Sequence, residues 1–136
     1  MKPVLISLAL VGAIASPATY AASPEALLAT LERTARSEQP AFAGFSADRG
    51  QTFFTQRHGG DWSCSTCHSS DPRSPGRHAV TAGPIEPLAP ATNAVRLSNP
   101  AKVEKWFRRN CRDVLARECT AAEKGDVVAY LLSLRP

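Results

Sequence analysis

The stretch Cys64-Ser65-Thr66-Cys67-His68 decides how the rest of the chain is organised. The pattern C-x-x-C-H is the signature at which a c-type haem is attached. Two thiols separated by two residues reach the two vinyl groups on one edge of a haem, and the following histidine lies beneath the ring as the proximal iron ligand. The stretch therefore predicts one covalently bound haem c, held by Cys64 and Cys67 as thioethers and by His68 at the iron.

Two other interpretations of the paired cysteines are weaker. A redox-active dithiol also has the form C-x-x-C, but it belongs to a βαβ context that nothing in this sequence indicates. A zinc site would need Cys111 and Cys119 as further ligands, and the seven residues between them exceed the spacing typical of such sites. The sequence therefore favours haem over a dithiol or zinc.

The first 22 residues predict a secretory signal peptide. A positive start at Met1 and Lys2 precedes an apolar run over residues 4–15 and a small-residue exit over residues 17–22. About a dozen apolar residues are too few to span a bilayer, and no other segment is longer, so we expect no membrane span. Residues 23–136 are then expected to form one mature domain of 114 residues, in the periplasm of a Gram-negative cell.

Export also bears on the two cysteines outside the motif. In an oxidising compartment Cys111 and Cys119 are expected to form a disulfide, and two free buried thiols are the alternative. The charge balance is mildly basic, with 16 Lys and Arg against 12 Asp and Glu before Lys2 is removed. So small an excess gives no support to nucleic-acid binding.

Helix signals divide residues 23–136 into four helices and a long loop. Capping residues begin the first helix at Ser23, the third at Asn99 and the last at Thr120, where Glu123 completes a capping box. The third helix is expected to run to about residue 115 and the last to about residue 134, while the second covers residues 47–57. Nothing indicates a strand. The fold class is therefore all-α, a small helical bundle around one haem.

The loop over residues 69–90 is rich in Pro, Gly and Ser. We expect its residues 83–88 to lie along the proximal side of the haem. A backbone carbonyl there is expected to accept a hydrogen bond from the second ring nitrogen of His68, because such contacts fix the orientation of a ligating imidazole.

The residue on the other side of the iron decides what the protein does. Methionine is the usual ligand in electron-carrying cytochromes. The chain has a single methionine, Met1, which leaves with the signal peptide, so methionine ligation is excluded. The residues themselves leave several alternatives: His58, His78, a lysine, Asn110 or no ligand.

Asn110 interrupts the apolar face of the third predicted helix, which carries Val103, Trp106, Phe107 and Val114. A buried amide must find a partner, which can be a backbone group, a haem propionate or the iron. The opposite face carries Lys102, Lys105, Arg109 and Arg112. That basic face is either a docking surface for an acidic partner or simply a solvated helix surface.

From about residue 50 to 134 the chain resembles the sphaeroides haem protein family, a group of small class I-like c-type cytochromes. The resemblance rests on the haem motif, on Pro87-Leu88-Ala89-Pro90, on Val103-Glu104-Lys105-Trp106, on Arg109-Asn110-Cys111, and on Cys119-Thr120 followed by Glu123-Lys124. One difference is Pro84, where the family pattern leads us to expect a lysine.

This resemblance implies a specific haem site. Asn110 would be the sixth, distal iron ligand, and Cys111 and Cys119 would form a disulfide. The iron would be high-spin and would bind dioxygen or nitric oxide when reduced. A dihaem cytochrome c would be the redox partner.

Ligand chemistry agrees, because an amide is a weak, hard donor that suits ferric better than ferrous iron. Reduction is expected to release Asn110 and open the iron to diatomic ligands. The predicted function is an exported, monomeric monohaem cytochrome that carries electrons and binds such ligands. The alternatives are an enzyme, such as a nitric oxide dioxygenase or weak peroxidase, and an ordinary low-spin electron carrier that uses His58 or His78.

Overall fold

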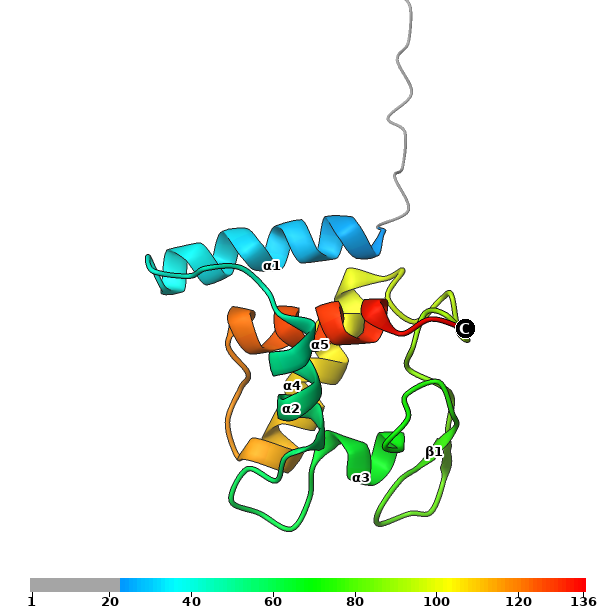
Figure 1. Cartoon of the computed structure of the whole chain (residues 1–136). Helices are drawn as coiled ribbons and strands as arrows, with labels where there is room; N and C mark the ends of the chain where they lie inside the picture. The colour runs from blue at the N-terminus through cyan, green and yellow to red at the C-terminus, as the bar shows by residue number, and fades with distance from the viewer. Residues whose placement is uncertain (1–22) are drawn as a thin grey trace, which may run out of the picture.

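The structure is a computed structural model that describes residues 23–136; the predicted signal peptide, residues 1–22, lies outside the described residues. Within that range the chain forms five helices and two short strands, arranged as Figure 1 shows. The elements are α1 (Pro24–Glu38), α2 (Ala47–Thr55), α3 (Cys64–His68), β1 (Gly76–Arg77), β2 (Pro84–Ile85), α4 (Pro100–Leu115) and α5 (Ala121–Ser133). The predicted all-α class is confirmed. No helix of residues 23–136 is long and apolar enough to cross a membrane.

The predicted helix starts are confirmed at three caps. The Ser23 hydroxyl accepts from the Ala26 amide at 3.2 Å, and the Asn99 side chain accepts from the Lys102 amide at 3.0 Å. Thr120 and Glu123 form the expected reciprocal capping box. These short polar side chains satisfy amides that have no partner within the helix, which is why the helices begin there.

The expectation that no strand forms is wrong within the long loop. Gly76 pairs with Ile85 and Arg77 with Pro84 in a minimal antiparallel ladder. The turn between them is closed by the His78 amide, which donates to the Gly83 carbonyl at 2.8 Å. Strands of two residues are too short to show an alternating pattern in the sequence, so the pairing left no signal to find.

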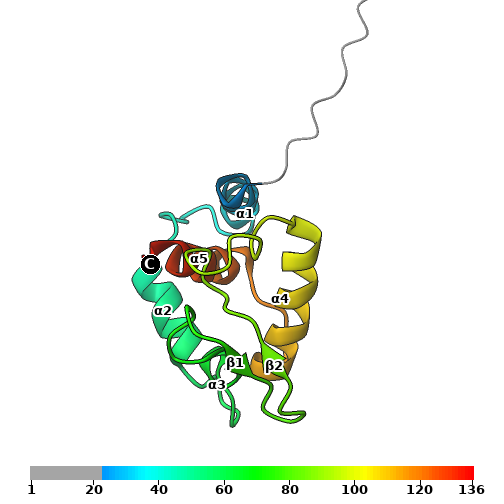
Figure 2. The ribbon, with the colours of Figure 1, turned by 90° about the vertical axis from the view of Figure 1, so that its right-hand side faces the viewer.

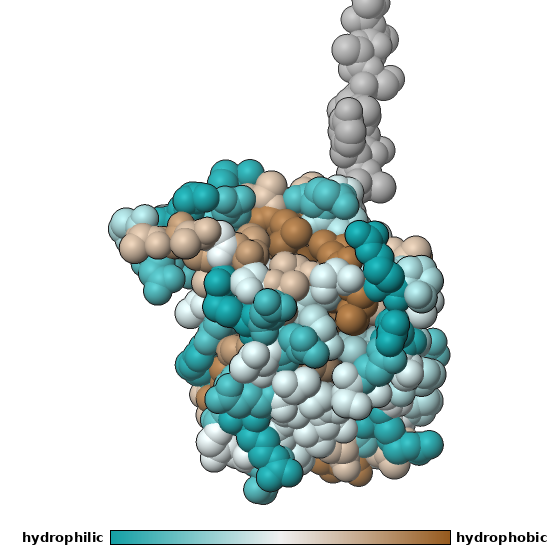
Figure 3. All heavy atoms as spheres, viewed as in Figure 1, coloured by the Kyte–Doolittle hydropathy of each residue, from teal (hydrophilic) through white to brown (hydrophobic). Residues whose placement is uncertain are grey.

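The core is built around α5, which packs against both α1 and α2 (Figures 1 and 2). One cluster joins Leu27 of α1 and Val103 of α4 to Val128 of α5. A second joins Phe54 of α2 to Leu131 and its neighbours on α5. On the face seen in Figure 3, hydrophobic residues gather along the junction of α1 with the helices beneath it, and hydrophilic side chains are scattered over the rest of that face.

An ion pair fixes the start of α2 on α5. Asp126 is buried, and its carboxylate accepts from the Ser46 amide at 2.7 Å and from Nε of Arg49 at 2.8 Å. The Arg49 guanidinium itself is half exposed, so its charge keeps contact with water. The carboxylate therefore serves mainly to satisfy the first turn of α2 and set its crossing with α5.

A capping carboxylate links α5 to the segment that precedes it, and it gives a pH-dependent prediction. Glu123 accepts from the Thr120 amide at 2.8 Å and from the Arg117 guanidinium at 2.6 Å, and the Arg117 hydrogen bond lowers the pKa of the carboxyl. We expect Glu123→Gln to reduce the free energy of unfolding by about 1 kcal/mol at pH 7.

The sign of the pH dependence follows from the lowered pKa. The stabilisation is present above the ordinary carboxyl pKa of 4.5 and is lost as pH falls through the lower folded value. Urea unfolding at pH 7 and pH 3 checks this, since the difference between wild type and variant should shrink in acid. An equal difference at both pH values would contradict the role of the charge.

Candidate functional site

The C-x-x-C-H stretch folds as a single helical turn, α3. A capping box at its start joins Ser63 and Thr66, whose side chains and backbone amides bond reciprocally. Cys64 and Cys67 are both free thiols, and Cys64 packs against the α2–α5 core cluster. The Ala79 amide donates to Sγ of Cys67 at 3.4 Å. The cap therefore holds the two thiols at a fixed helical spacing, three residues apart.

The structure disfavours the dithiol and zinc interpretations. Burial raises the pKa of the Cys64 thiol to about 11, whereas a reactive dithiol needs a lowered pKa. Cys111 and Cys119 are joined by a disulfide, with their Cα atoms 5.7 Å apart. They are therefore not available to a metal, and residues 23–136 contain no cluster of three or more potential His, Cys, Asp or Glu ligands.

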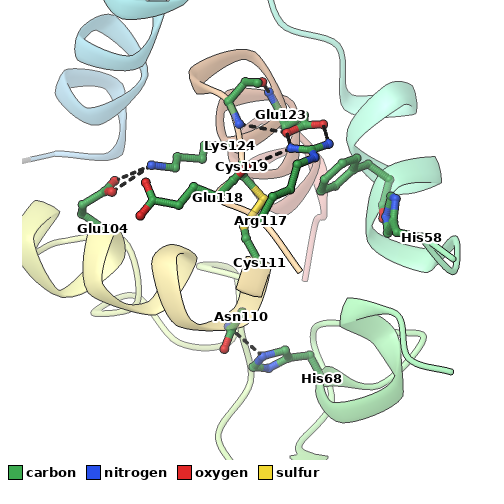
Figure 4. Close-up of a disulfide and its surroundings, with 12 residues drawn as sticks. His58, His68, Glu104, Asn110, Cys111, Arg117, Glu118, Cys119, Glu123 and Lys124 are labelled. Atoms are coloured by element: carbon green, nitrogen blue, oxygen red, sulfur yellow. Dashed lines mark hydrogen bonds and ion pairs between the residues drawn. A yellow bond between two sulfur atoms is a disulfide. The ribbon is translucent and has the colours of Figure 1, made fainter. Parts of the chain in front are cut away.

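His68 presents one ring nitrogen to α4. Its Nε2 lies 3.4 Å from Nδ2 of Asn110, and Figure 4 shows the two side chains pointing toward each other. Because an amide nitrogen can only donate, Nε2 accepts and carries the lone pair. Burial, together with the positive charge of Arg96, lowers the pKa of His68 to about 4, which keeps the ring neutral. A neutral imidazole with a free lone pair is the form that binds metals.

The predicted carbonyl acceptor for the second ring nitrogen of His68 is wrong. Nδ1 is buried and has no hydrogen-bond partner in the described chain. Two carbonyls of the loop expected to supply it are already engaged, because Arg96 donates to Glu86 O at 2.8 Å and to Pro87 O at 2.9 Å. Arg96 thus takes up carbonyls of the loop that the sequence had predicted to bind the second ring nitrogen of His68.

Asn110 occupies the side of α4 that turns toward α3. The side chain is half-buried, and its contact with His68 is the one side-chain hydrogen bond it makes among residues 23–136. Phe107, one turn earlier, packs against the core clusters on both sides. Trp106 departs from the predicted apolar stripe, since it is 46 % exposed and carries the Arg109 guanidinium over its ring. Asn110 is therefore brought to His68 rather than into the core.

The two other histidines are engaged in local contacts. Nε2 of His58 lies 2.9 Å from the Phe53 carbonyl, and its ring packs at a tilt against the Phe53 ring, with the ring centres 4.4 Å apart. Nδ1 of His78 accepts from the amides of Val80 and Thr81, both at 3.2 Å. In either neutral ring the proton is then on Nε2, so this nitrogen offers no lone pair. The structure brings neither residue into hydrogen-bond contact with His68.

These groups fit a covalently attached haem. Two free thiols and an imidazole lie on one turn, which is the donor set that a c-type haem requires. Across from the imidazole lies an amide held on a different helix, and the second imidazole nitrogen is a buried polar atom without a partner. No other cluster of the described residues combines these features.

Two residues near the site were missed from the sequence. Gly76 lies directly against the Cys67 carbonyl, and a Cβ there would overlap it. Arg96 holds the neighbouring loop and is close enough to His68 to influence its pKa. A single glycine or arginine in an irregular loop has no periodicity or motif, so neither could have been singled out without the fold.

Comparison with known sequences identifies similar proteins. A family described as a domain of unknown function, DUF1924, matches residues 40–131. Cytochrome c'' of Methylophilus methylotrophus is 34% identical over 113 residues, which cover 80% of this chain and 78% of that protein. The cytochrome c-type protein SHP of Cereibacter sphaeroides is 40% identical over 98 residues, which cover 69% and 75% respectively.

Solved structures show the same similarity. Oxidised cytochrome c'' superposes with a TM-score of 0.73 at 32% identity, covering 83% of this chain and 95% of that one. Oxidised SHP, described as an oxygen binding cytochrome c, gives a TM-score of 0.72 at 39% identity and covers 82% and 97%. A solution structure of cytochrome c'', described as giving insight into haem-ligand detachment, gives 0.73 at 32% identity and covers 83% and 94%.

Proposed function

The chain belongs to the DUF1924 family and is a relative of the cytochromes SHP and cytochrome c'', and we propose that it is an exported electron carrier whose iron accepts diatomic ligands after reduction. The resemblance to the sphaeroides haem protein family is confirmed, as is the small helical fold of a class I-like cytochrome c. The protein is a monohaem cytochrome with a covalently bound haem c.

We assign the attachment of the haem to Cys64 and Cys67 and the proximal iron bond to His68. Both thiols are free, and the His68 ring is neutral with the lone pair of Nε2 directed away from α3. When bound there, haem supplies a one-electron iron couple and a metal position that can accept a small ligand. The protein's own contribution is to hold one face of that group firmly and to control the other.

Asn110 is proposed as the distal ligand, and one observation carries this assignment. Its amide lies 3.4 Å from Nε2 of His68, with the two residues contributed by different helices. A carboxamide is a weak, hard donor, so it binds ferric iron better than ferrous iron. With haem bound, Asn110 would therefore bind the iron in the oxidised protein and would give up that bond on reduction.

The surroundings of Asn110 support its release. Among residues 23–136 no other hydrogen bond restrains its side chain, while Phe107 forms an apolar wall one turn away. A freed amide remains on the same helix and can donate a hydrogen bond to an incoming dioxygen or nitric oxide molecule. The relatives point the same way, since SHP is described as an oxygen binding cytochrome c and cytochrome c'' is described in terms of haem-ligand detachment.

Export and partner choice belong to the same proposal. The signal peptide of residues 1–22 would deliver residues 23–136 to the periplasm as one soluble, monomeric domain. The electron partner implied by the family resemblance is a dihaem cytochrome c. Reduction by that partner would then be the event that opens the distal site.

The proposal is tested by changing Asn110 in haem-loaded protein. We expect reduced wild type to bind carbon monoxide, and Asn110→Ala to alter the ferric spectrum while leaving carbon monoxide binding by the reduced form intact. Asn110→His supplies a strong donor in both oxidation states. It should slow carbon monoxide binding by about tenfold or more, which corresponds to about 1.4 kcal/mol on the barrier.

The matched controls are His58→Ala and His78→Ala, which remove the two competing histidines one at a time. Neither should change the ferric spectrum or the binding of carbon monoxide. A reduced wild-type protein that is low-spin and indifferent to carbon monoxide would overturn the proposal. A changed ferric spectrum in either histidine variant would instead identify that histidine as the distal donor.

A further inference from the structure

The positive charge of the protein is concentrated on α4. This helix carries five basic residues against two acidic ones, whereas the rest of residues 23–136 has ten of each. The helix therefore accounts for the whole formal charge of +3 in the described chain. We call its basic residues the cationic face of α4: Lys102, Lys105, Arg108, Arg109 and Arg112, all of them exposed.

This cationic face is largely unpaired. Lys102, Lys105 and Arg108 make no ion pair within residues 23–136, and Arg112 reaches Glu118 at 3.2 Å. On α1, by contrast, Arg36 pairs with Glu32 at 2.6 Å. Like charges at intervals of three and four residues destabilise a helix, so this arrangement opposes folding rather than assisting it.

The cationic face is also concave in part. Four of its members and Asp113 line a shallow hollow of about 250 Å³; the four are Lys105, Arg108, Arg109 and Arg112. At its edge the Arg109 guanidinium lies 5.7 Å from the ring centre of Trp106, which is half exposed. Trp106 lies one helical turn before Asn110 on the same side of α4, whereas the residues that line the hollow lie on the opposite face. Arg109 and Trp106 therefore connect the hollow to the side of the helix that carries the amide.

We propose that the cationic face of α4 is the docking site for an acidic electron-carrier protein that reduces the iron. This inference rests on the proposed function and adds the surface and the kind of partner. An acidic patch on the carrier meets the lysine and arginine side chains, while Trp106 and Arg109 supply the aromatic and guanidinium contacts that interface centres favour. One electron passes from the carrier, which is oxidised, to the ferric iron, which is reduced, and no proton or group moves between the proteins.

Complementary charge raises the rate of encounter more than the final affinity, and salt screens it. The experiment therefore measures, in a stopped-flow instrument, the rate at which a reduced plant-type [2Fe–2S] ferredoxin, an acidic carrier of low reduction potential, reduces the haem-loaded protein. For wild type the second-order rate constant should fall steeply with ionic strength.

The test variant is Lys105→Glu with Arg108→Glu, and the control is Arg33→Glu with Arg57→Glu. Both pairs change the net charge by the same amount, and the control residues are exposed and lie on α1 and after α2. At low salt the test variant should lose about tenfold or more in rate constant and most of its salt dependence. The control should lose no more than about threefold. Equal losses in the two variants would mean that only net charge matters and would overturn the docking site.

Two further measurements separate this inference from the proposed function. Reduction by dithionite and carbon monoxide binding should be the same in both variants and wild type, because neither needs the cationic face. If carbon monoxide binding is as expected but ferredoxin reduces the test variant as fast as wild type, the docking site fails and the Asn110 proposal stands. Binding of vesicles of phosphatidylglycerol or of duplex DNA through Lys105 and Arg108, with unchanged ferredoxin rates, would assign the face to those ligands and also overturn the proposal.

Discussion

Gly50→Ala is expected to lower the free energy of unfolding by about 3 kcal/mol. Gly50 lies at the crossing of α2 and α5, where a Cβ would overlap the backbone carbonyl of Asp126 and come within 2.9 Å of the Tyr130 Cβ. A backbone group cannot turn aside as a flexible side chain does, so the two helices must separate. The higher helix propensity of alanine offsets only about 1 kcal/mol of this cost.

The measurement is urea unfolding of haem-loaded protein, followed by far-ultraviolet circular dichroism. Gly60→Ala is the matched control, since it makes the same chemical change at an exposed position whose nearest atom, the Val114 carbonyl oxygen, is 4.0 Å away. The control should differ from wild type by no more than about 0.5 kcal/mol. A Gly50→Ala protein as stable as the control would show that the crossing can widen freely.

The helix crossing illustrates what the sequence could and could not predict. The starts of α1, α4 and α5 were predicted because a cap is a local event, decided by one side chain and the amides within three residues of it. The close approach at Gly50 was not, because it depends on a segment 76 residues away in the chain. The same is true of Asp126, whose partners Ser46 and Arg49 lie at the N-cap and in the first turn of α2.

In the candidate site, too, some features could be predicted from the sequence and others could not. The haem motif and the contact partner of His68 on α4 were predicted from spacing, inventory and family resemblance, and the iron ligation itself stays a prediction. The loop contact to His68 was predicted wrongly because the sequence does not reveal that Arg96 occupies the carbonyls of Glu86 and Pro87. Competition for an acceptor is a property of the folded chain and leaves no pattern in the sequence.

Apolar contacts, an ion pair and a disulfide hold α4 in place. Its apolar contacts with the core come from Val103 and Phe107, and a Glu104–Lys124 ion pair at 2.8 Å adds a polar link to α5 (Figure 4). The Cys111–Cys119 disulfide is the covalent link between the helix and the segment before α5. Because Cys111 directly follows Asn110, this link is the one closest to the distal amide.

Replacing both cysteines, as Cys111→Ser with Cys119→Ser, is expected to lower the free energy of unfolding by about 2–3 kcal/mol, the loop-closure value for a bridge of this short span. The second expected effect is on the site. With the bridge removed, the end of α4 is free to move, so the ferric spectrum should shift toward that of Asn110→Ala.

The control is Glu104→Gln with Lys124→Gln, which removes the ion pair nearly two turns from Asn110. Since Glu104 is half exposed, losing this pair should lower the free energy of unfolding by no more than about 1 kcal/mol. If the ion-pair variant alters the spectrum as much as the disulfide variant does, the position of Asn110 depends on α4 as a whole and the bridge has no special role in holding the amide.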